Sequence, residues 1–74
     1  MSQIGTLHNN PDEDRFGLLD PAGEWIVSGL HCGQTVEIDI GAGWVPDRIE
    51  YGNDWYLTES RLTGRQLEGL KVRC

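Results

Sequence analysis

Turn-forming residues divide this sequence into short segments, and their spacing limits the possible folds more than any other feature. The chain has 10 glycines and three prolines among 74 residues, and clusters of Asn, Asp, Pro and Gly recur at close intervals. No window shows apolar spacing over the length of a helix that could connect two parallel strands. Short segments between close turns therefore predict an antiparallel, all-β domain.

Six segments between these turns have the composition of β-strands, and a seventh lies at the end of the chain. They are residues 4–8, 15–19, 24–28, 35–40, 44–51, 55–58 and 69–73. Leu62 and Leu67, on either side of residues 64–66, predict one short helical turn before the last strand. Pairing the last segment with the first would close the sheet and remove its open edges. We expect a single domain over residues 1–74, a small antiparallel barrel of five to six strands similar to the Src-homology-3 type.

The turn at residues 20–23 predicts one part of the core. Its order, with Asp first, Pro second and Gly fourth, favours a type I turn. A four-residue loop there places Leu18 opposite Trp25, and Phe16 opposite Val27. All four side chains then lie on one face of the hairpin, so we expect Trp25 to be a core residue.

Apolar alternation predicts the pairing of the next two hairpins. Placing Ile40 opposite Val45 keeps apolar residues together on the inner face. A three-residue loop after the strand 44–51 places Tyr51 opposite Trp55, with both side chains inward. The same alternation points the Asp47 carboxylate inward, which is favourable only at the rim of the barrel.

The composition limits the possible activities and partners. A core of 74 residues is too small to hold a substrate cleft of about 300 Å³, so we do not expect an enzyme. The net charge of -6 disfavours nucleic acid and anionic membranes as partners and favours a basic protein surface. Residues 1–5 lack the basic and apolar segments that would indicate a signal peptide, and no apolar run approaches the ~20 residues that cross a bilayer. We expect a cytoplasmic protein in which Cys32 and Cys74 are free thiols.

No residue pattern predicts catalysis, a metal or a cofactor. His31 and Cys32 are adjacent, but neighbours in a strand point to opposite faces and cannot form a catalytic pair. Together with His8 and Cys74 they lack the spacing of a zinc site. The acidic residues 12–14 lack the alternation and the glycine of a calcium loop. We therefore expect no catalytic residue, no metal ligand and no cofactor.

One set of residues has the composition of a binding surface. With the registers above, alternate side chains of the strand 44–51 point outward, and Tyr56 lies beside Glu50. The outward set is Trp44, Pro46, Arg48, Glu50 and Tyr56. Because Trp, Tyr and Arg are enriched at interface hot spots, we expect Trp44, Arg48, Glu50 and Tyr56 to bind a protein or a small ligand. The alternative is that Trp44 covers the end of the barrel and Arg48 pairs with Glu37.

Four strings occur in order along most of the chain. They are Gly-Leu-His-Cys-Gly at 29–33, Trp-Val-Pro-Asp-Arg-Ile-Glu at 44–50, Trp-Tyr-Leu at 55–57 and Leu-Glu-Gly-Leu-Lys-Val-Arg at 67–73. By these strings the chain resembles a family of small proteins of Gram-positive bacteria, their phages and mobile elements, classed as a domain of unknown function. That family usually has Thr where this chain has Asp47. The resemblance implies no activity and no site residues, but its mobile-element context implies a second hypothesis: an inhibitor of a host defence protein that acts through its acidic surface.

Overall fold

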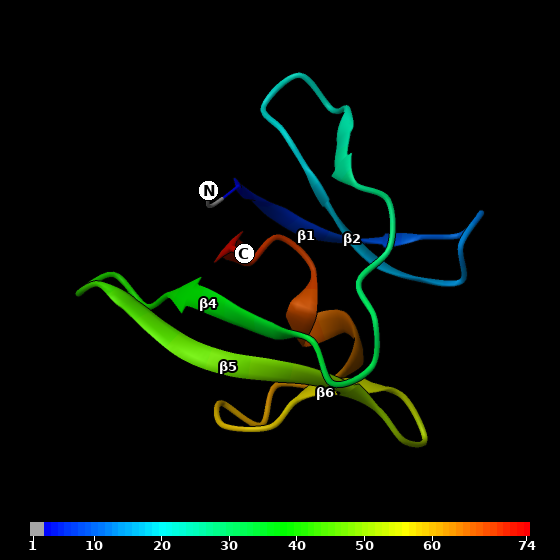
Figure 1. Cartoon of the computed structure of the whole chain (residues 1–74). Helices are drawn as coiled ribbons and strands as arrows, with labels where there is room; N and C mark the ends of the chain where they lie inside the picture. Colours follow the sequence, from blue (N-terminus) through cyan, green and yellow to red (C-terminus); the bar gives the residue numbers. More distant parts are fainter. Residues whose placement is uncertain (1–2) are drawn as a thin grey trace.

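The computed structural model describes residues 3–74 and contains seven strands in one antiparallel sheet (Figure 1). The strands are β1 (Ile4–Asn10), β2 (Arg15–Leu19), β3 (Trp25–Val27), β4 (Thr35–Asp39), β5 (Trp44–Tyr51), β6 (Trp55–Leu57) and β7 (Lys71–Arg73). A single 3-10 turn, η1 (Gly64–Leu67), precedes β7. The all-β class and the short helical turn before the last strand are therefore confirmed.

The sheet curls around its core but does not close into a barrel. Its strand order is β3-β2-β1-β7-β4-β5-β6, so β7 lies at the centre, with the β1–β2 hairpin on one side and the β4–β5 hairpin on the other (Figure 1). The last strand pairs with the first, as predicted, but its other edge pairs with β4. The prediction that the sheet closes into a barrel was therefore wrong, because β3 and β6 remain as two separate edge strands. The strand count also exceeds the predicted five to six, because both three-residue end strands pair.

The concave, inner face of the sheet carries the core. Alternate residues of most strands point inward, η1 contributes Leu67, and the connector after β3 contributes Leu30. The buried hydrophobic side chains are Leu7, Phe16, Leu18, Leu30, Val36, Ile38, Ile49, Trp55, Leu57, Leu67 and Val72. Each fully buried aliphatic side chain contributes about 1.5–3 kcal/mol relative to exposure. Residues 3–74 contain no helix that is long and apolar enough to span a membrane.

Trp25 is not a core residue, and a β-bulge explains why. The turn before β3 forms with its amide-to-carbonyl hydrogen bond, as predicted. However, β3 pairs Val27 with Leu18 and Trp25 with Leu19, so Ile26 is an extra residue on this strand. Ile26 and Val27 both pack against the core, and Trp25 is 38% exposed on the outer face.

The register of the β4–β5 hairpin differs from the prediction by two residues. Val45 pairs with Ile38, and Ile40 lies in the loop and is 59% exposed. Gly41 and Gly43 have φ angles of 89° and 139°, which only glycine adopts easily. These two glycines let the chain turn directly after Ile40. The turn therefore sets the register, and the predicted apolar pairing of Ile40 with Val45 does not form.

The β5–β6 register is confirmed, with Tyr51 opposite Trp55. The two rings meet edge to face at 5.0 Å, but Tyr51 lies at the end of the sheet and is 56% exposed. Tyr51 therefore shares the side of the buried Trp55, as predicted, but it is not buried in the core. Asp47 does point inward, as predicted, and it is 4% exposed.

Candidate binding face

The structure places all four predicted site residues on the outer face of β5 and β6. Trp44, Arg48 and Glu50 alternate along β5, and Tyr56 pairs with Glu50 from β6. Arg48 is exposed and the other three are half-buried. Trp44 lies six residues from Glu50, about 20 Å along an extended strand, so the four residues form two groups rather than one cluster.

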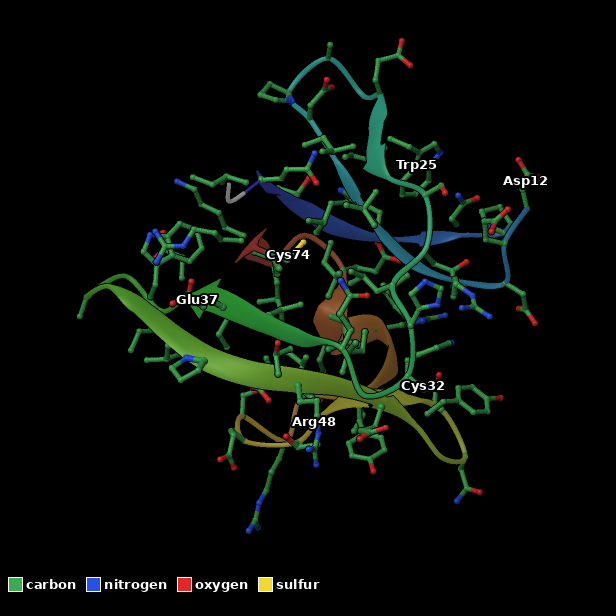
Figure 2. All side chains as sticks on the ribbon, in the orientation of Figure 1. Asp12, Trp25, Cys32, Glu37, Arg48 and Cys74 are labelled. Carbon is green, nitrogen blue, oxygen red and sulfur yellow. The ribbon has the colours of Figure 1, made fainter. Side chains whose placement is uncertain are left out.

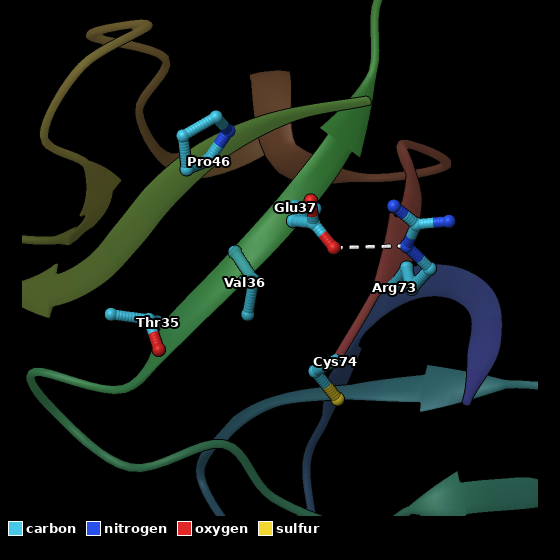
Figure 3. A pocket seen from close by; sticks show the side chains of 6 residues that line it. All are labelled: Thr35, Val36, Glu37, Pro46, Arg73 and Cys74. Carbon is cyan, nitrogen blue, oxygen red and sulfur yellow. Dashed lines mark hydrogen bonds and ion pairs between the residues drawn. The ribbon is translucent and has the colours of Figure 1, made fainter. Parts of the chain in front are cut away.

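The first group joins Trp44 to Arg73, which the sequence did not indicate, and to Glu37, which it indicated only as a partner of Arg48. The Arg73 guanidinium lies over the Trp44 ring, with its carbon 4.5 Å from the ring centroid. Nε of Arg73 donates to Oε1 of Glu37 at 2.9 Å (Figure 3). The two residues are cross-strand neighbours on β7 and β4. The stack exists because β7 lies beside β4, a pairing that no local pattern predicts.

The second group consists of Arg48, Glu50 and Tyr56. Nε of Arg48 lies 3.1 Å from Oε2 of Glu50, its neighbour two residues along β5. The alternative pairing of Arg48 with Glu37 is therefore wrong, since Glu37 pairs with Arg73 instead. Both ion pairs are partly exposed, so each contributes little to stability. Their effect is to orient the two guanidinium groups on the outer face.

Two shallow depressions lie on this face and share Thr35 and Pro46 in their lining. One is lined also by Glu37, Arg73 and the half-buried Cys74 (Figure 3), and its volume is about 340 Å³. The other has the same volume and extends toward Arg48 and the turn after β6. Both are open to solvent. Such depressions can receive side chains of a partner but do not enclose a substrate.

Asp47 fixes the turn that borders the second depression. Its Oδ1 accepts hydrogen bonds from the backbone amides of Arg48 at 2.7 Å and Glu59 at 2.9 Å. Its Oδ2 accepts from the amide of Ser60 at 3.1 Å, and the Thr58 hydroxyl donates to Oδ1 at 3.4 Å. Burial alone raises the pKa of Asp47, but the amides of Glu59, Arg48 and Ser60 together lower it more, so the pKa lies below its ordinary value.

The remaining chemical candidates do not form a site. Within residues 3–74, no three His, Cys, Asp or Glu side chains are grouped so that they could hold a metal ion. His31 contacts Arg15, 3.4 Å from Nη1, and the Cys32 thiol is exposed on the same loop (Figure 2). Cys74 is also free, and burial raises the pKa of its thiol.

Comparison with known proteins supports the fold and the relationship suggested by the four strings. A sequence profile for DUF5348, a domain of unknown function, matches residues 5–74. The chain belongs to this family. The crystal structure of a protein from Ruminococcus gnavus is similar to this DUF5348 domain, with 36% sequence identity and a TM-score of 0.80. The similarity covers 97% of this chain and 100% of that one. No curated protein matches the chain.

Proposed function

We propose that this DUF5348 domain is a non-enzymatic binding module whose partner is a protein that contacts the outer face of β4, β5 and β6. The observation that carries the proposal is the aromatic and arginine surface described above, in which neighbouring side chains contact one another. Arg73 holds the Trp44 ring, and Glu50 holds Arg48, beside depressions of side-chain size. Contacts of this kind restrict side chains before binding, which reduces the entropy that they lose on association. Trp, Tyr and Arg are also the residues that most often dominate binding energy.

The open shape of the face favours a protein over a small ligand. A small molecule usually needs a pocket that encloses most of its surface, whereas both depressions are shallow. As part of the proposal, we infer a use like that of Src-homology-3-type small barrels, which bind peptides in shallow aromatic-lined grooves. We place the domain in the cytoplasm, where its two thiols stay reduced.

The distribution of charge favours a second candidate, inhibition of a basic host protein by the acidic surface. The outer face of β4, β5 and β7 contains three ion pairs, Arg48–Glu50, Lys71–Asp39 and Arg73–Glu37, and has no net charge. The other nine acidic and three basic side chains therefore account for the whole net charge of -6. They include the exposed turn residues Asp12, Glu13 and Asp14.

Site-specific photo-crosslinking in cells of the source organism distinguishes the two candidates. A photoreactive amino acid at position 56 reports on the outer face, and one at position 12 reports on the acidic turn. Under the first candidate, a protein is captured from position 56 and not from position 12. Capture from position 12 alone would support the inhibitor instead.

Binding of the captured protein to purified variants then tests the role of Trp44. We expect Trp44→Ala to keep the melting temperature within a few degrees and to weaken binding by about 2 kcal/mol or more, roughly 30-fold. Tyr51→Ala is the matched control, since Tyr51 is exposed and lies away from the face. If Trp44→Ala binds as tightly as the parent, the aromatic-face proposal is wrong. It is also wrong if salt weakens binding steeply and this salt dependence disappears when Asp12, Glu13 and Asp14 are replaced.

A further inference from the structure

The beginning of β4 has a backbone edge that no other strand covers within residues 3–74. β7 pairs with β4 only at Glu37 and Ile38, so Thr35 extends past it. Thr35 is exposed and lies opposite Arg48 of β5, on the candidate binding face. The open edge is therefore continuous with the surface that we propose to bind a partner.

Hydrogen bonds on either side of Thr35 show which way its backbone groups point. Residues of a central antiparallel strand bond alternately to one neighbouring strand and to the other. The carbonyl of Gln34 accepts from the Ile49 amide of β5, so the next residue, Thr35, points its amide and carbonyl toward the β7 side. Arg48, opposite Thr35, agrees with this, because its carbonyl accepts from the Thr58 amide on the side away from β4. Thr35 therefore offers one donor and one acceptor to a strand that continues the line of β7.

The residue that follows β7 does not take these two groups. Cys74 exchanges both of its backbone hydrogen bonds with Gln3, at 3.0 and 2.7 Å, and so bonds toward β1. Among residues 3–74, no group bonds to the amide or carbonyl of Thr35. One of the two depressions lies at this place: Thr35 and Val36 line it from β4, and Cys74 lines it from beyond β7 (Figure 3). We call this part of the depression, between Thr35 and Cys74, the strand slot.

We propose that the strand slot receives an extended segment of the protein partner, which runs antiparallel to β4 and continues the line of β7. This inference rests on the proposed function, because the slot opens onto the candidate binding face. One residue of the segment exchanges two main-chain hydrogen bonds with Thr35, as when a peptide adds a strand to an open sheet edge. Such bonds fix the direction and register of a segment even where the depression is shallow.

Alternation along the sheet indicates which side chains suit the segment. The residue opposite Thr35 points its side chain to the outer face, as Thr35 does, and the residue after it points to the inner face, where Val36 is buried. A β-branched side chain pairs well with Thr35 across strands, and an apolar one suits the inner position. Cys74 fills the preceding position on this line, so the segment turns into the slot opposite Thr35. We therefore expect alternating residues such as Thr and Val, and no proline opposite Thr35, because proline has no amide to donate.

Residues added after Cys74 test the slot without any partner. The extension Thr-Val-Thr-Val continues β7, and its first residue should pair with Thr35. We expect hydrogen exchange of the Thr35 amide, followed by NMR, to be fast in the parent and at least about tenfold slower in the extended chain. Pro-Gly-Asn-Gly is the matched control, since it has the same length and no amide at its first position. A Thr35 amide that is already protected in the parent, or that exchanges equally in both extended chains, overturns the inference.

Photo-crosslinking from position 56 then tests the partner separately. The Thr-Val-Thr-Val extension occupies the slot within the same molecule, so capture of the partner should fall about tenfold or more. The control extension should capture the partner as the parent does. If both extended chains capture it equally, the slot inference is wrong and the binding face stands. If the parent itself captures no protein from position 56, the proposed function fails, and the segment proposed here fails with it.

Discussion

Replacing Asp47 with Asn tests whether one buried carboxylate holds the turn after β6. The side chain keeps its size, but an amide has only one acceptor atom where the carboxylate has two. If the asparagine oxygen takes the place of Oδ1, its NH₂ group takes the place of Oδ2. The backbone amide of Ser60 then faces a second donor and loses its acceptor. Hydrogen bonds to a charged group contribute about 1.5–3 kcal/mol each, and water can replace part of this near the surface. We expect Asp47→Asn to lower the unfolding free energy by about 2 kcal/mol, and Asp47→Ala by about 3 kcal/mol.

The pKa of Asp47 gives this prediction a pH dependence with a definite sign. The backbone amides outweigh the effect of burial, so the folded-state pKa lies below the ordinary value of 3.8. A group with a lowered folded pKa contributes stability above its unfolded pKa and loses that contribution as pH falls through the folded value. Asp47→Asn cannot titrate at this position. The difference in unfolding free energy should be constant from pH 7 to about 5 and should shrink as the solution becomes more acidic.

Urea denaturation followed by tryptophan fluorescence at about pH 7, 5 and 3 measures this difference. Other titrating groups are the same in both proteins, so their effects cancel. Asp12→Asn is the control, because Asp12 is exposed in the β1–β2 turn and should change little (Figure 2). A difference as large at pH 3 as at pH 7, or no difference at pH 7, would refute the role assigned to this carboxylate.

Three other predictions follow from burial and backbone geometry. In urea denaturation, Trp55→Ala should cost about 3–5 kcal/mol, whereas Trp25→Ala should cost less than about 1 kcal/mol because Trp25 is partly exposed. Arg61 has a φ of 63°, so Arg61→Gly should relieve strain and raise the unfolding free energy by up to about 1 kcal/mol in the same assay. Iodoacetamide should label both thiols without a reductant, and mass spectrometry should detect the exposed Cys32 adduct before that of Cys74, whose pKa is raised by burial.

The features that the sequence predicted are those that neighbouring residues decide. Turn chemistry locates the 20–23 loop, and alternation along residues 44–51 assigns Asp47 and Ile49 to one face and Arg48 to the other. The three-residue loop before Trp55 sets the β5–β6 register correctly. In each case the deciding contacts lie within a few residues, so turn type and period-2 alternation are sufficient.

The features that the sequence did not predict depend on contacts between distant segments. The place of β7 between β1 and β4 decides that the sheet stays open, and it also brings Arg73 over Trp44. Neither consequence leaves a local signal, because β7 is short and its alternation fits any neighbouring strand. Arg73 and its pairing with Glu37 were missed for this reason, while the outward positions on β5 were found.

The β-bulge at Ile26 shows how one residue changes both the core and the surface. Without it, the four-residue turn would pair Leu18 with Trp25 and bury the indole. With it, two aliphatic residues take the inner positions and Trp25 moves to the outer face, beside Leu19. Ile26 and Val27 already fill the core positions next to β3, so a core of this size has little room for the Trp25 indole as well. One inserted residue therefore decides whether the indole of Trp25 lies in the core or on the outer face of the sheet.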